Sequence, residues 1–373
     1  MSRIRVLVVD DAVVVRRLVS DALSSDPEIE VVGTAANGRI ALAKLDQINP
    51  DVVTLDIEMP ELDGLGTLRE LRKLRPHLPV IMCSTLTERG GSATLDALAL
   101  GANDYVTKPH GYANADEALA RLRDQLVPKV KALGLRAQQR SAAAPVGAAV
   151  PRRAIVPVLR PSLAAPTTGG RLDVLTIGVS TGGPNALAAL IPMLPVDLPV
   201  PVLIVQHMPP LFTRLLADRL NGTSRLQVRE AVAGAVVEPG TVWIAPGDQH
   251  MEVVREKTRV VIRLHEGPPE NSCRPAVDVL FRSAAQVYGA GTLGVILTGM
   301  GRDGVRGAEA IREMGGRVLA QDEASSVVWG MPGYVANAGL AEAVLPLSEM
   351  AQGILRRLAA GRGVHPIGAG SAS

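Results

Sequence analysis

The sequence predicts two doubly wound α/β domains, each built on a mostly parallel sheet. At 373 residues the chain is longer than one hydrophobic core normally serves. Short apolar runs alternate with helical patterns in two blocks, and a segment rich in Ala, Pro and Arg separates them. Hydrophobic residues make up 47% of the chain and aromatic residues only 2%, so the cores are aliphatic, as in sheets covered by helices on both faces.

In the first block, five expected strands alternate with five expected helices. The strands are expected at residues 5–9, 29–35, 52–56, 79–83 and 105–107. The helices are expected up to about residue 23 and at 38–45, 65–74, 92–100 and 115–126. This regular alternation is typical of a doubly wound parallel sheet, and it places a first domain at residues 1–127.

The segment at residues 128–170 has a different composition. It is rich in Ala, Pro and Arg, and it contains neither Asp nor Glu. Such a composition rarely packs a core, so we predict a mobile linker. A basic patch for an acidic partner is the alternative. A second domain then covers residues 171–360, and residues 361–373 form a flexible tail.

The second block repeats the alternation of strands and helices. Strands are expected at residues 173–179, 201–206, 242–245, 259–265 and 293–297. Helices are expected at residues 185–193, 211–220, 276–287 and 305–314, and Pro184 suits the first position of its helix. We expect a mostly parallel sheet with an antiparallel hairpin near residues 240–265.

Composition also limits the cellular setting and the partners. The formal net charge of +2 gives no reason to expect nucleic-acid binding. The two cysteines, Cys83 and Cys273, fall in different domains and favour a reduced, cytoplasmic protein. The N-terminus lacks the apolar run of a signal peptide, and proline and aspartate interrupt the apolar stretch at 187–205. We therefore expect no direct insertion into a membrane.

Acidic residues gather at strand ends in the first block. Asp10, Asp11 and Asp56 follow two different strands, and the carboxyl ends of parallel strands form the usual ligand crevice. Three carboxylates at one edge suit Mg²⁺. Lys108 and Ser84 end two further strands and can contact phosphate oxygens. Each residue alone could be a helix cap or a surface residue, but together they indicate a site.

Ser180 lies in the turn Gly-Val-Ser-Thr-Gly-Gly-Pro, between a strand and a helix. The glycines allow a sharp turn that presents the hydroxyl near a helix N-terminus, where negative charge is favoured. The turn lacks the Gly-Lys-Ser/Thr ending of a phosphate loop and the Gly-x-Gly-x-x-Gly of a dinucleotide site. It fits a serine nucleophile, and in isolation it also fits a structural turn with a capping serine.

A serine nucleophile needs a base and an acid that orients it. His207 ends a strand as Ser180 does, while His250 is the runner-up and His265 is less well placed. Asp303 lies in a glycine-rich loop after another strand; the weaker candidates for the acid are Asp248 and Asp322. The order Ser, His, Asp differs from the Ser, Asp/Glu, His order of α/β-hydrolases, which argues against an ordinary lipase or esterase fold.

The first block resembles the receiver domain of two-component response regulators. The segments VLVVDDA, DVVTLDIEMPELDG, PVIMCS and DYVTKP carry the resemblance. It implies a flavodoxin-like domain with a five-stranded parallel sheet, in which Asp56 accepts a phosphoryl group. It further implies that Mg²⁺ is held by Asp10, Asp11, Asp56 and the carbonyl of Glu58, and that the phosphoryl group is read by Ser84, Lys108 and the switch residue Tyr105.

The second block resembles the catalytic domain of the chemotaxis protein-glutamate methylesterases. The segments GVSTGGP, VLIVQHMPP, WIAPGDQHM, RPAVDVLFRSAA, LGVILTGMGRDG and AQDEASSVVWGMP carry this resemblance. It implies Ser180 as nucleophile, His207 as base and Asp303 as orienting acid, with Thr181 and the N–H of Met300 binding the oxyanion. Family members often carry a histidine near Cys273, before Arg274 and Pro275; this chain has cysteine there.

The two resemblances together imply an enzyme that phosphorylation activates. It would demethylate glutamate methyl esters on the cytoplasmic part of methyl-accepting chemotaxis receptors, and it could deamidate glutamines there. The phosphodonor would be the chemotaxis sensor histidine kinase, and the hydrolase chemistry would need no cofactor. Two alternatives stay open: a response regulator whose output is binding, for example to DNA, and a phosphorylation-gated hydrolase of another ester or amide.

Overall fold

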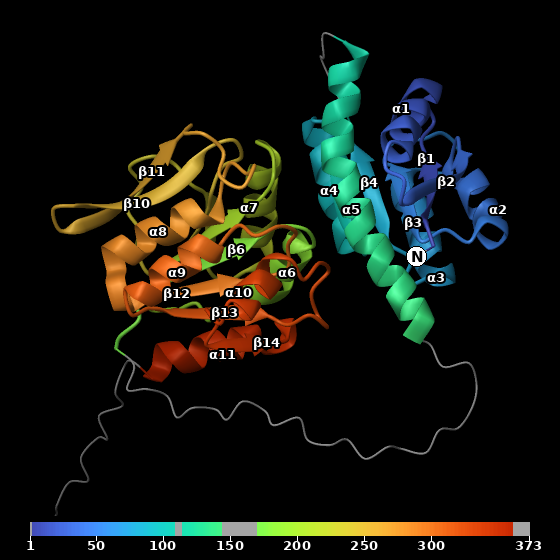
Figure 1. Cartoon of the computed structure of the whole chain (residues 1–373). Coiled ribbons are helices and arrows are strands. Elements are labelled where there is room, and N and C mark those ends of the chain that lie inside the picture. The colour runs from blue at the N-terminus through green and yellow to red at the C-terminus, as the bar shows by residue number, and fades with distance from the viewer. Residues whose placement is uncertain (1, 109–113, 144–169, 361–373) are drawn as a thin grey trace, which may run out of the picture.

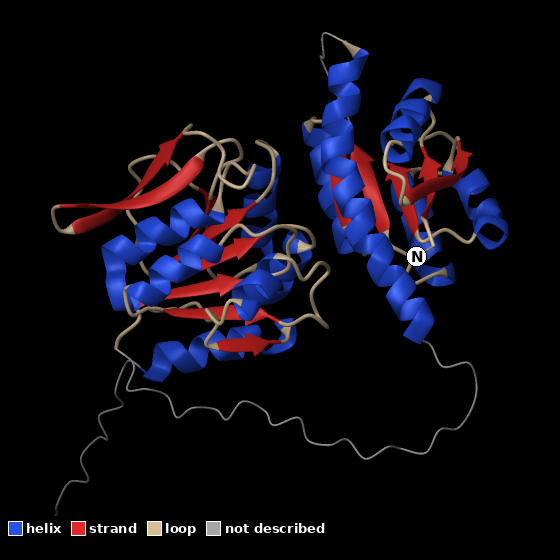
Figure 2. Ribbon diagram, in the orientation of Figure 1, coloured by secondary structure: helices blue, strands red, loops and turns tan. Residues whose placement is uncertain are grey.

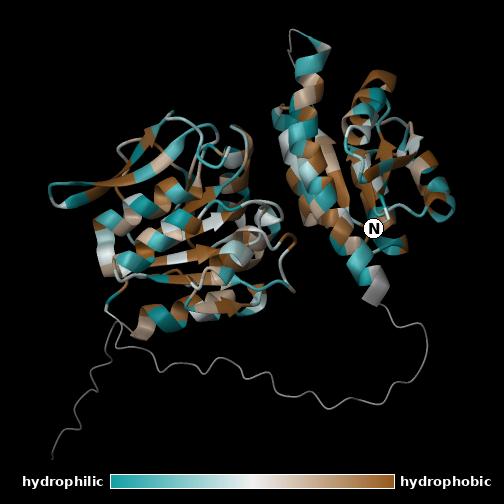
Figure 3. Ribbon diagram, in the orientation of Figure 1, coloured by the Kyte–Doolittle hydropathy of each residue, from teal (hydrophilic) through white to brown (hydrophobic). Residues whose placement is uncertain are grey.

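The computed structural model describes residues 2–108, 114–143 and 170–360. Two α/β units follow one another along the chain, each with a central sheet flanked by helices (Figures 1 and 2). In Figure 3 much of the ribbon along the strands has the hydrophobic colour, in agreement with their burial. Outside the described residues lie positions 144–169 of the linker predicted at 128–170, the tail predicted at 361–373, and the histidines at 110 and 365.

The N-terminal unit is a five-stranded parallel sheet with the strand order β2-β1-β3-β4-β5. This is the flavodoxin-like order, so the predicted fold class is confirmed for this unit. Its strands are β1 (Ile4–Val9), β2 (Ile29–Ala35), β3 (Val52–Asp56), β4 (Val80–Ser84) and β5 (Asp104–Thr107). Its helices are α1 (Val13–Ser24), α2 (Gly38–Ile48), α3 (Gly64–Leu74), α4 (Glu88–Ala99) and α5 (Ala115–Ala143).

Side-chain caps define where three of these helices begin. The side chains of Asn37, Asp63 and Thr87 accept hydrogen bonds from backbone N–H groups in the first turns of α2, α3 and α4, at 2.7–3.0 Å. Such caps satisfy donors that have no partner inside the helix. They fix where each helix begins in the loop that follows a strand.

The helix α5 corrects the prediction that a linker begins at residue 128. It continues through Pro128 to Ala143, with Val130 and Leu133 buried against the sheet. Proline removes one helical hydrogen bond, but the apolar packing of the next two turns keeps the helix intact. Lys131 adds an ion pair to Asp26 at 3.2 Å. Residues 128–143 of the predicted linker are therefore part of the N-terminal unit.

The C-terminal unit contains a seven-stranded parallel sheet with the order β14-β13-β12-β6-β7-β9-β8, and a separate antiparallel hairpin of β10 and β11. The fold predicted for this part of the chain is confirmed. The strands are β6 (Val174–Val179), β7 (Val202–Gln206), β8 (Gln227–Glu230), β9 (Thr241–Ile244), β10 (His250–Glu256), β11 (Arg259–His265), β12 (Thr292–Ile296), β13 (Arg317–Gln321) and β14 (Ala343–Leu345).

Helices cover both faces of this larger sheet (Figure 2). They are α6 (Gly183–Leu190), α7 (Phe212–Thr223), α8 (Val277–Tyr288), α9 (Val305–Glu313), α10 (Met331–Asn337) and α11 (Leu347–Ala360). The chain enters at β6, runs to β7 on one side, and later returns to β12 on the other side of β6. In open α/β sheets, ligands bind beyond the carboxyl ends of the central strands at such a reversal.

The two units meet where α4 and β5 of the first face α6 and α7 of the second. The rings of Tyr105 and Phe212 stack with centroids 4.9 Å apart and planes 4° apart. Arg219 pairs with Asp96 at 2.7 Å. The side-chain amide of Asn185 donates a 2.7 Å hydrogen bond to the carbonyl of Leu98. Because Asn185 lies in the first turn of α6, this contact comes close to Ser180 along the chain.

Across the described parts of the chain, no helix combines the length and the apolar character that crossing a membrane requires.

Candidate active site

Three neighbouring strands of the larger sheet deliver the predicted catalytic residues. Ser180 follows β6, His207 follows β7, and Asp303 lies in the loop after β12. Backbone hydrogen bonds lock the three ends together: the N–H of His207 donates to Val179 at 3.2 Å, and the N–H of Ser180 donates to Thr298 at 3.0 Å. The structure therefore brings all three segments to one edge of the sheet.

Two glycines allow the turn that carries Ser180. Gly182 has a φ of 76°, in the left-handed region that favours glycine. At Gly183 an added Cβ would lie 1.9 Å from the side-chain oxygen of Gln206, so the position has no room for a side chain. Gln206 in turn donates a 3.0 Å hydrogen bond to the carbonyl of Ser180. The close packing of this turn against β7 therefore requires glycine at residue 183.

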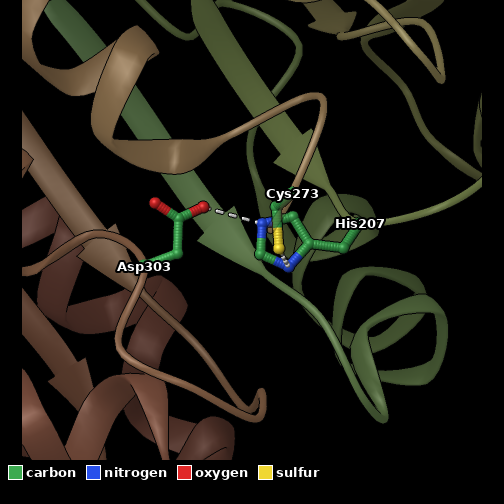
Figure 4. Close-up of side chains that lie close together, drawn as sticks. All are labelled: His207, Cys273 and Asp303. Carbon is green, nitrogen blue, oxygen red and sulfur yellow. Dashed lines mark hydrogen bonds and ion pairs between the residues drawn. The ribbon is translucent and has the colours of Figure 1, made fainter. Parts of the chain in front are cut away.

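His207 and Asp303 form a buried pair. Nε2 of His207 lies 2.8 Å from Oδ2 of Asp303, and Asp303 is only 1% exposed (Figure 4). Asp303 also accepts hydrogen bonds from the backbone N–H groups of Val277 at 2.6 Å and Asp278 at 3.0 Å. The side-chain amide of Asn271 adds another at 3.1 Å. The carboxylate is therefore fixed from several sides and holds the imidazole in one orientation.

Electrostatics favour the charged form of this pair. Burial opposes the charged form of His207, but hydrogen bonds to Asp303 and Cys273 outweigh it and raise the pKa of the ring to about 10. Burial likewise opposes ionisation of Asp303, but the contact with His207 and the backbone donors lower the pKa of the carboxyl. At neutral pH the ring is therefore held mainly as an imidazolium against a carboxylate.

The structure does not join Ser180 to this pair. Among the described residues, the Ser180 hydroxyl has no hydrogen-bond partner, whereas Nδ1 of His207 faces Cys273. The backbone N–H groups of Thr181 and Met300 likewise donate to no group in the part of the chain that is described. Unengaged N–H groups beside a serine are what an oxyanion requires. Catalytic hydrogen bonds are often long in enzymes without substrate.

The competing histidines and acids are engaged elsewhere. His250 is buried, and its ring lies 3.0 Å from the carbonyl of Pro268 and accepts the N–H of Ala276 at 3.2 Å. His265 faces Glu252 at 3.5 Å. Asp248 pairs with Arg274 at 2.6 Å, and Asp322 accepts hydrogen bonds from Ser325. Of the four histidines that the structure describes, only His207 contacts Asp303.

Sequence reasoning missed the loop that closes the site from the side of α8. Asn271 bridges Asp303 and Asp278, at 3.1 Å and 2.9 Å. The sulfur of Cys273 lies 3.6 Å from Nδ1 of His207. Neither residue ends a strand, so the strand-end argument could not find them. The departure from histidine at residue 273 was the one available signal.

The predicted acidic site also forms, at the carboxyl ends of β1 and β3. Ligand oxygens of Asp10, Asp11 and Asp56 lie within 4.8 Å of one another. Lys108 reaches both Asp10 and Asp56, at 2.7 Å each. A pocket of about 260 Å³ opens there, and it is lined among others by Asp11, Asp56, Glu58, Ser84 and Lys108.

The charges at this site are strongly perturbed. Burial raises the pKa of Asp56 to about 6, although Lys108 acts in the opposite direction. Burial lowers the pKa of Lys108, but its contacts with Asp10 and Asp56 outweigh that effect and raise it. The hydroxyl of Ser84 donates to the carbonyl of Gly90 at 3.1 Å, so it must turn to meet a phosphoryl group. Asp56 is thus mostly ionised at neutral pH, as a nucleophile must be.

Tyr105 lies apart from these acids, in the contact between the two units. It is 7% exposed and stacks on Phe212, as described above. Its carbonyl accepts a 2.6 Å hydrogen bond from Lys129 in α5. The predicted switch residue therefore sits where a change in the first unit would be felt by the second.

Comparisons with known proteins match each of the two units separately. Residues 6–120 match the family model described as "Response regulator receiver domain", and residues 175–354 match the model described as "CheB methylesterase". A crystal structure of the CheB methylesterase catalytic domain from Thermotoga maritima is 44% identical, covers 50% of this chain and 98% of its own, and has a TM-score of 0.49.

Full-length relatives extend the match across both units. The protein-glutamate methylesterase/protein-glutamine glutaminase of Trichodesmium erythraeum is 50% identical over 96% of this chain and 100% of its own length. The protein of the same name from a Nocardioides species is 55% identical over 96% of each chain. These identities exceed what a shared fold alone requires, and they confirm both resemblances. The chain belongs to the protein-glutamate methylesterase/protein-glutamine glutaminase family.

Proposed function

We propose that this chain hydrolyses γ-glutamyl methyl esters with Ser180 as nucleophile, His207 as base and Asp303 as the acid that orients the base. The observation that carries the assignment is the 2.8 Å contact between His207 and Asp303, one strand away from the Ser180 turn. Neutral His207 takes the proton of Ser180 as the hydroxyl attacks the ester carbonyl. Methanol then leaves, and water releases the glutamate from the acyl-enzyme.

The tetrahedral intermediate needs donors for its negative oxygen. The N–H groups of Thr181 and Met300 have no partner among the described residues, and both lie in loops beside Ser180. Donors held in this way stabilise charge that develops only in the transition state. Deamidation of glutamine passes through the same kind of intermediate, so one site supports both activities named in the relatives.

The acidic pocket serves phosphorylation of Asp56. Asp10, Asp11 and Asp56 supply carboxylates, and the carbonyl of Glu58 is the further ligand we assign, a set of hard oxygen donors that fits Mg²⁺. When bound, the ion would supply positive charge for phosphoryl transfer. Lys108, already paired with two of these acids, would shift to the phosphoryl oxygens.

Phosphorylation would act on the hydrolase through the contact between the two units. The added phosphoryl group carries ~1.5–2 negative charges, enough to bias a two-state element. Tyr105, α4 and α5 lie between Asp56 and the second unit, and α4 contacts Asn185 beside the Ser180 turn. We assign the unphosphorylated first unit the role of obstructing the crevice.

Substrates and partners follow from the family. We assign as substrate the cytoplasmic part of methyl-accepting chemotaxis receptors, and as phosphodonor a chemotaxis histidine kinase, both in the cytoplasm. The division into a receiver at 1–127, a linker and a hydrolase at 171–360 stays a prediction, apart from α5, which carries the first unit to Ala143.

One experiment tests the substrate, the hydrolysis and its control by phosphorylation together. Purified full-length protein is incubated with methylated receptor membranes, with and without a small-molecule phosphodonor and Mg²⁺, and released methanol is measured. We expect release that the phosphodonor stimulates in the wild type and leaves unchanged in the Asp56→Asn variant. Absence of methanol release from folded protein under both conditions would remove the methylesterase assignment for this chain.

The raised pKa of His207 predicts a strong pH dependence. The base must be neutral, and its pKa of about 10 lies above neutral pH. The apparent kcat/KM should therefore rise ~10-fold per pH unit below that value and level off near it. The Cys273→Ala variant removes one contact that raises this pKa, so its profile should level off at lower pH. A rate that is flat from pH 7 to 10 would contradict the assignment of His207 as base.

A further inference from the structure

Cys273 places a sulfur ligand beside the imidazole of His207. Its Sγ lies 3.6 Å from Nδ1, and the residue is half-buried at the edge of the site (Figure 4). In zinc sites the Zn–S distance is about 2.3 Å and the Zn–N distance about 2.0–2.1 Å, so tetrahedral S and N ligands lie about 3.5–3.6 Å apart. The observed separation, at which the two atoms form a hydrogen bond, also allows both of them to bind one zinc ion.

The other ring nitrogen of His207, Nε2, makes the kind of contact that is usual in histidines that bind zinc through one nitrogen. Nε2 of His207 contacts Oδ2 of Asp303 at 2.8 Å. A carboxylate on the far nitrogen fixes the ring orientation and makes the near nitrogen a better ligand. Asp303 is itself held by the N–H groups of Val277 and Asp278, so it keeps this position without an ion. The three residues form one of two groups with metal-ligating potential among the described residues.

The two groups differ in chemical character. Asp10, Asp11 and Asp56 offer only oxygen, which suits Mg²⁺. His207 and Cys273 offer nitrogen and thiolate sulfur, which suit Zn²⁺ and other borderline or soft cations. The first unit therefore offers an oxygen site that suits a hard ion, and the second offers a nitrogen and sulfur site that suits a softer one.

We propose that Zn²⁺ binds Nδ1 of His207 and Sγ of Cys273 and thereby inhibits the hydrolase. The inference rests on the proposed function in one respect, namely that His207 is the base. The ion displaces one proton from the ring nitrogen and one from the thiol, and water occupies its remaining positions. A ring nitrogen bound to zinc cannot accept the proton of Ser180, so attack on the ester stops until a chelator removes the ion.

Binding is tested without reference to catalysis. Co²⁺ replaces Zn²⁺ as the probe, and thiolate-to-cobalt absorption in the near ultraviolet is titrated on the full chain with excess Mg²⁺ present to fill the acidic site. We expect a 1:1 signal in the wild type that zinc displaces. The Cys273→Ser and His207→Gln variants should lose it, and the Cys83→Ser variant, which lacks only the cysteine of the first unit, should keep it.

Inhibition is then measured as methanol release against Zn²⁺, with each variant compared with its own metal-free rate. The zinc concentration for half inhibition should rise by at least ~10-fold in Cys273→Ser, because this variant removes a ligand and loss of an outer-shell partner alone weakens metal binding by ~10–100-fold. Absence of the cobalt signal in the wild type, or its persistence in Cys273→Ser, overturns the site. A cobalt signal together with full activity in saturating zinc overturns the inhibition. A cobalt signal in a chain that releases no methanol upholds the metal site and defeats the proposed function instead.

Discussion

Replacing Ser180 with alanine is expected to lower kcat for methanol release by roughly 10⁴- to 10⁶-fold. Only the hydroxyl group is removed, and the hydrogen bonds of the residue's backbone carbonyl with Gln206 and of its N–H with Thr298 stay in place. The fold should therefore survive, with a melting temperature close to that of the wild type. The loss would reflect the missing nucleophile, since the unengaged N–H groups of the site remain.

The control for this variant is Ser224→Ala, which removes a serine after the end of α7 and should leave the rate nearly unchanged. The neighbouring thiol adds a second test. Sγ of Cys273 lies within 3.6 Å of the same ring, so a residual rate in Ser180→Ala that vanishes on adding Cys273→Ala would show the thiol acting in place of the hydroxyl. An undiminished rate in the Ser180→Ala single variant would refute Ser180 as the nucleophile.

The second large effect is expected for Asp303→Asn, with a loss of about 10⁴-fold in kcat. The carboxylate accepts hydrogen bonds from backbone N–H groups and from Asn271, and it contacts Nε2 of His207. An amide presents N–H where an acceptor is needed, so the ring loses its orientation and its raised pKa. Stability should fall as well, by about 1–3 kcal/mol, because a buried donor is left without a partner.

Rate and stability must be measured together to interpret this variant. Kinetics and thermal unfolding of the same preparation separate a misoriented base from an unfolded domain. The matched control is Asp322→Asn, which changes the weaker candidate for the acid, outside the His207 pair. If Asp303→Asn folds and retains more than a tenth of the wild-type rate, another residue orients the base.

The sequence predicted most strands well because they are short aliphatic runs, and β1, β3, β4, β6, β7 and β12 are almost wholly buried. Five strands in the first unit and β6, β7, β9, β11 and β12 in the second lie within two residues of their expected bounds. The strand β14 was missed because it has three residues and little burial, and β8 because alternate residues are exposed. β10, β13, α10 and α11 were also left out of the expected elements.

The change in composition at Pro128 predicts the end of the first unit too early. In the structure Val130 and Leu133 continue the buried apolar face of α5 beyond it. Local propensity lost to tertiary packing at this point. Composition also gives no sign that α5 extends far enough for Arg136 to contact the second unit.

For the site, strand-end logic was sufficient for His207 and Asp303 but could not establish the state of Ser180. Parallel strands bring their carboxyl ends together, so position along the chain predicted proximity. The direction of the Ser180 hydroxyl depends on a side-chain rotation that no sequence pattern encodes. The hydrogen bonds from Asn271 and the contact with Cys273 depend on the path of a loop whose residues show no periodicity.

The far end of α5 has a consequence for experiments with fragments. Arg136 donates hydrogen bonds to the carbonyls of Val327, Ala324 and Glu323, at 2.8–3.2 Å. Val327 packs against Gly182 in the serine turn, and Val328 accepts the N–H of Gly299 at 3.0 Å. The first unit thus braces, through Arg136 in α5, a loop that contacts the serine turn. A hydrolase fragment without the first unit would lose this brace, so its rate is expected to stay below that of the activated full-length protein.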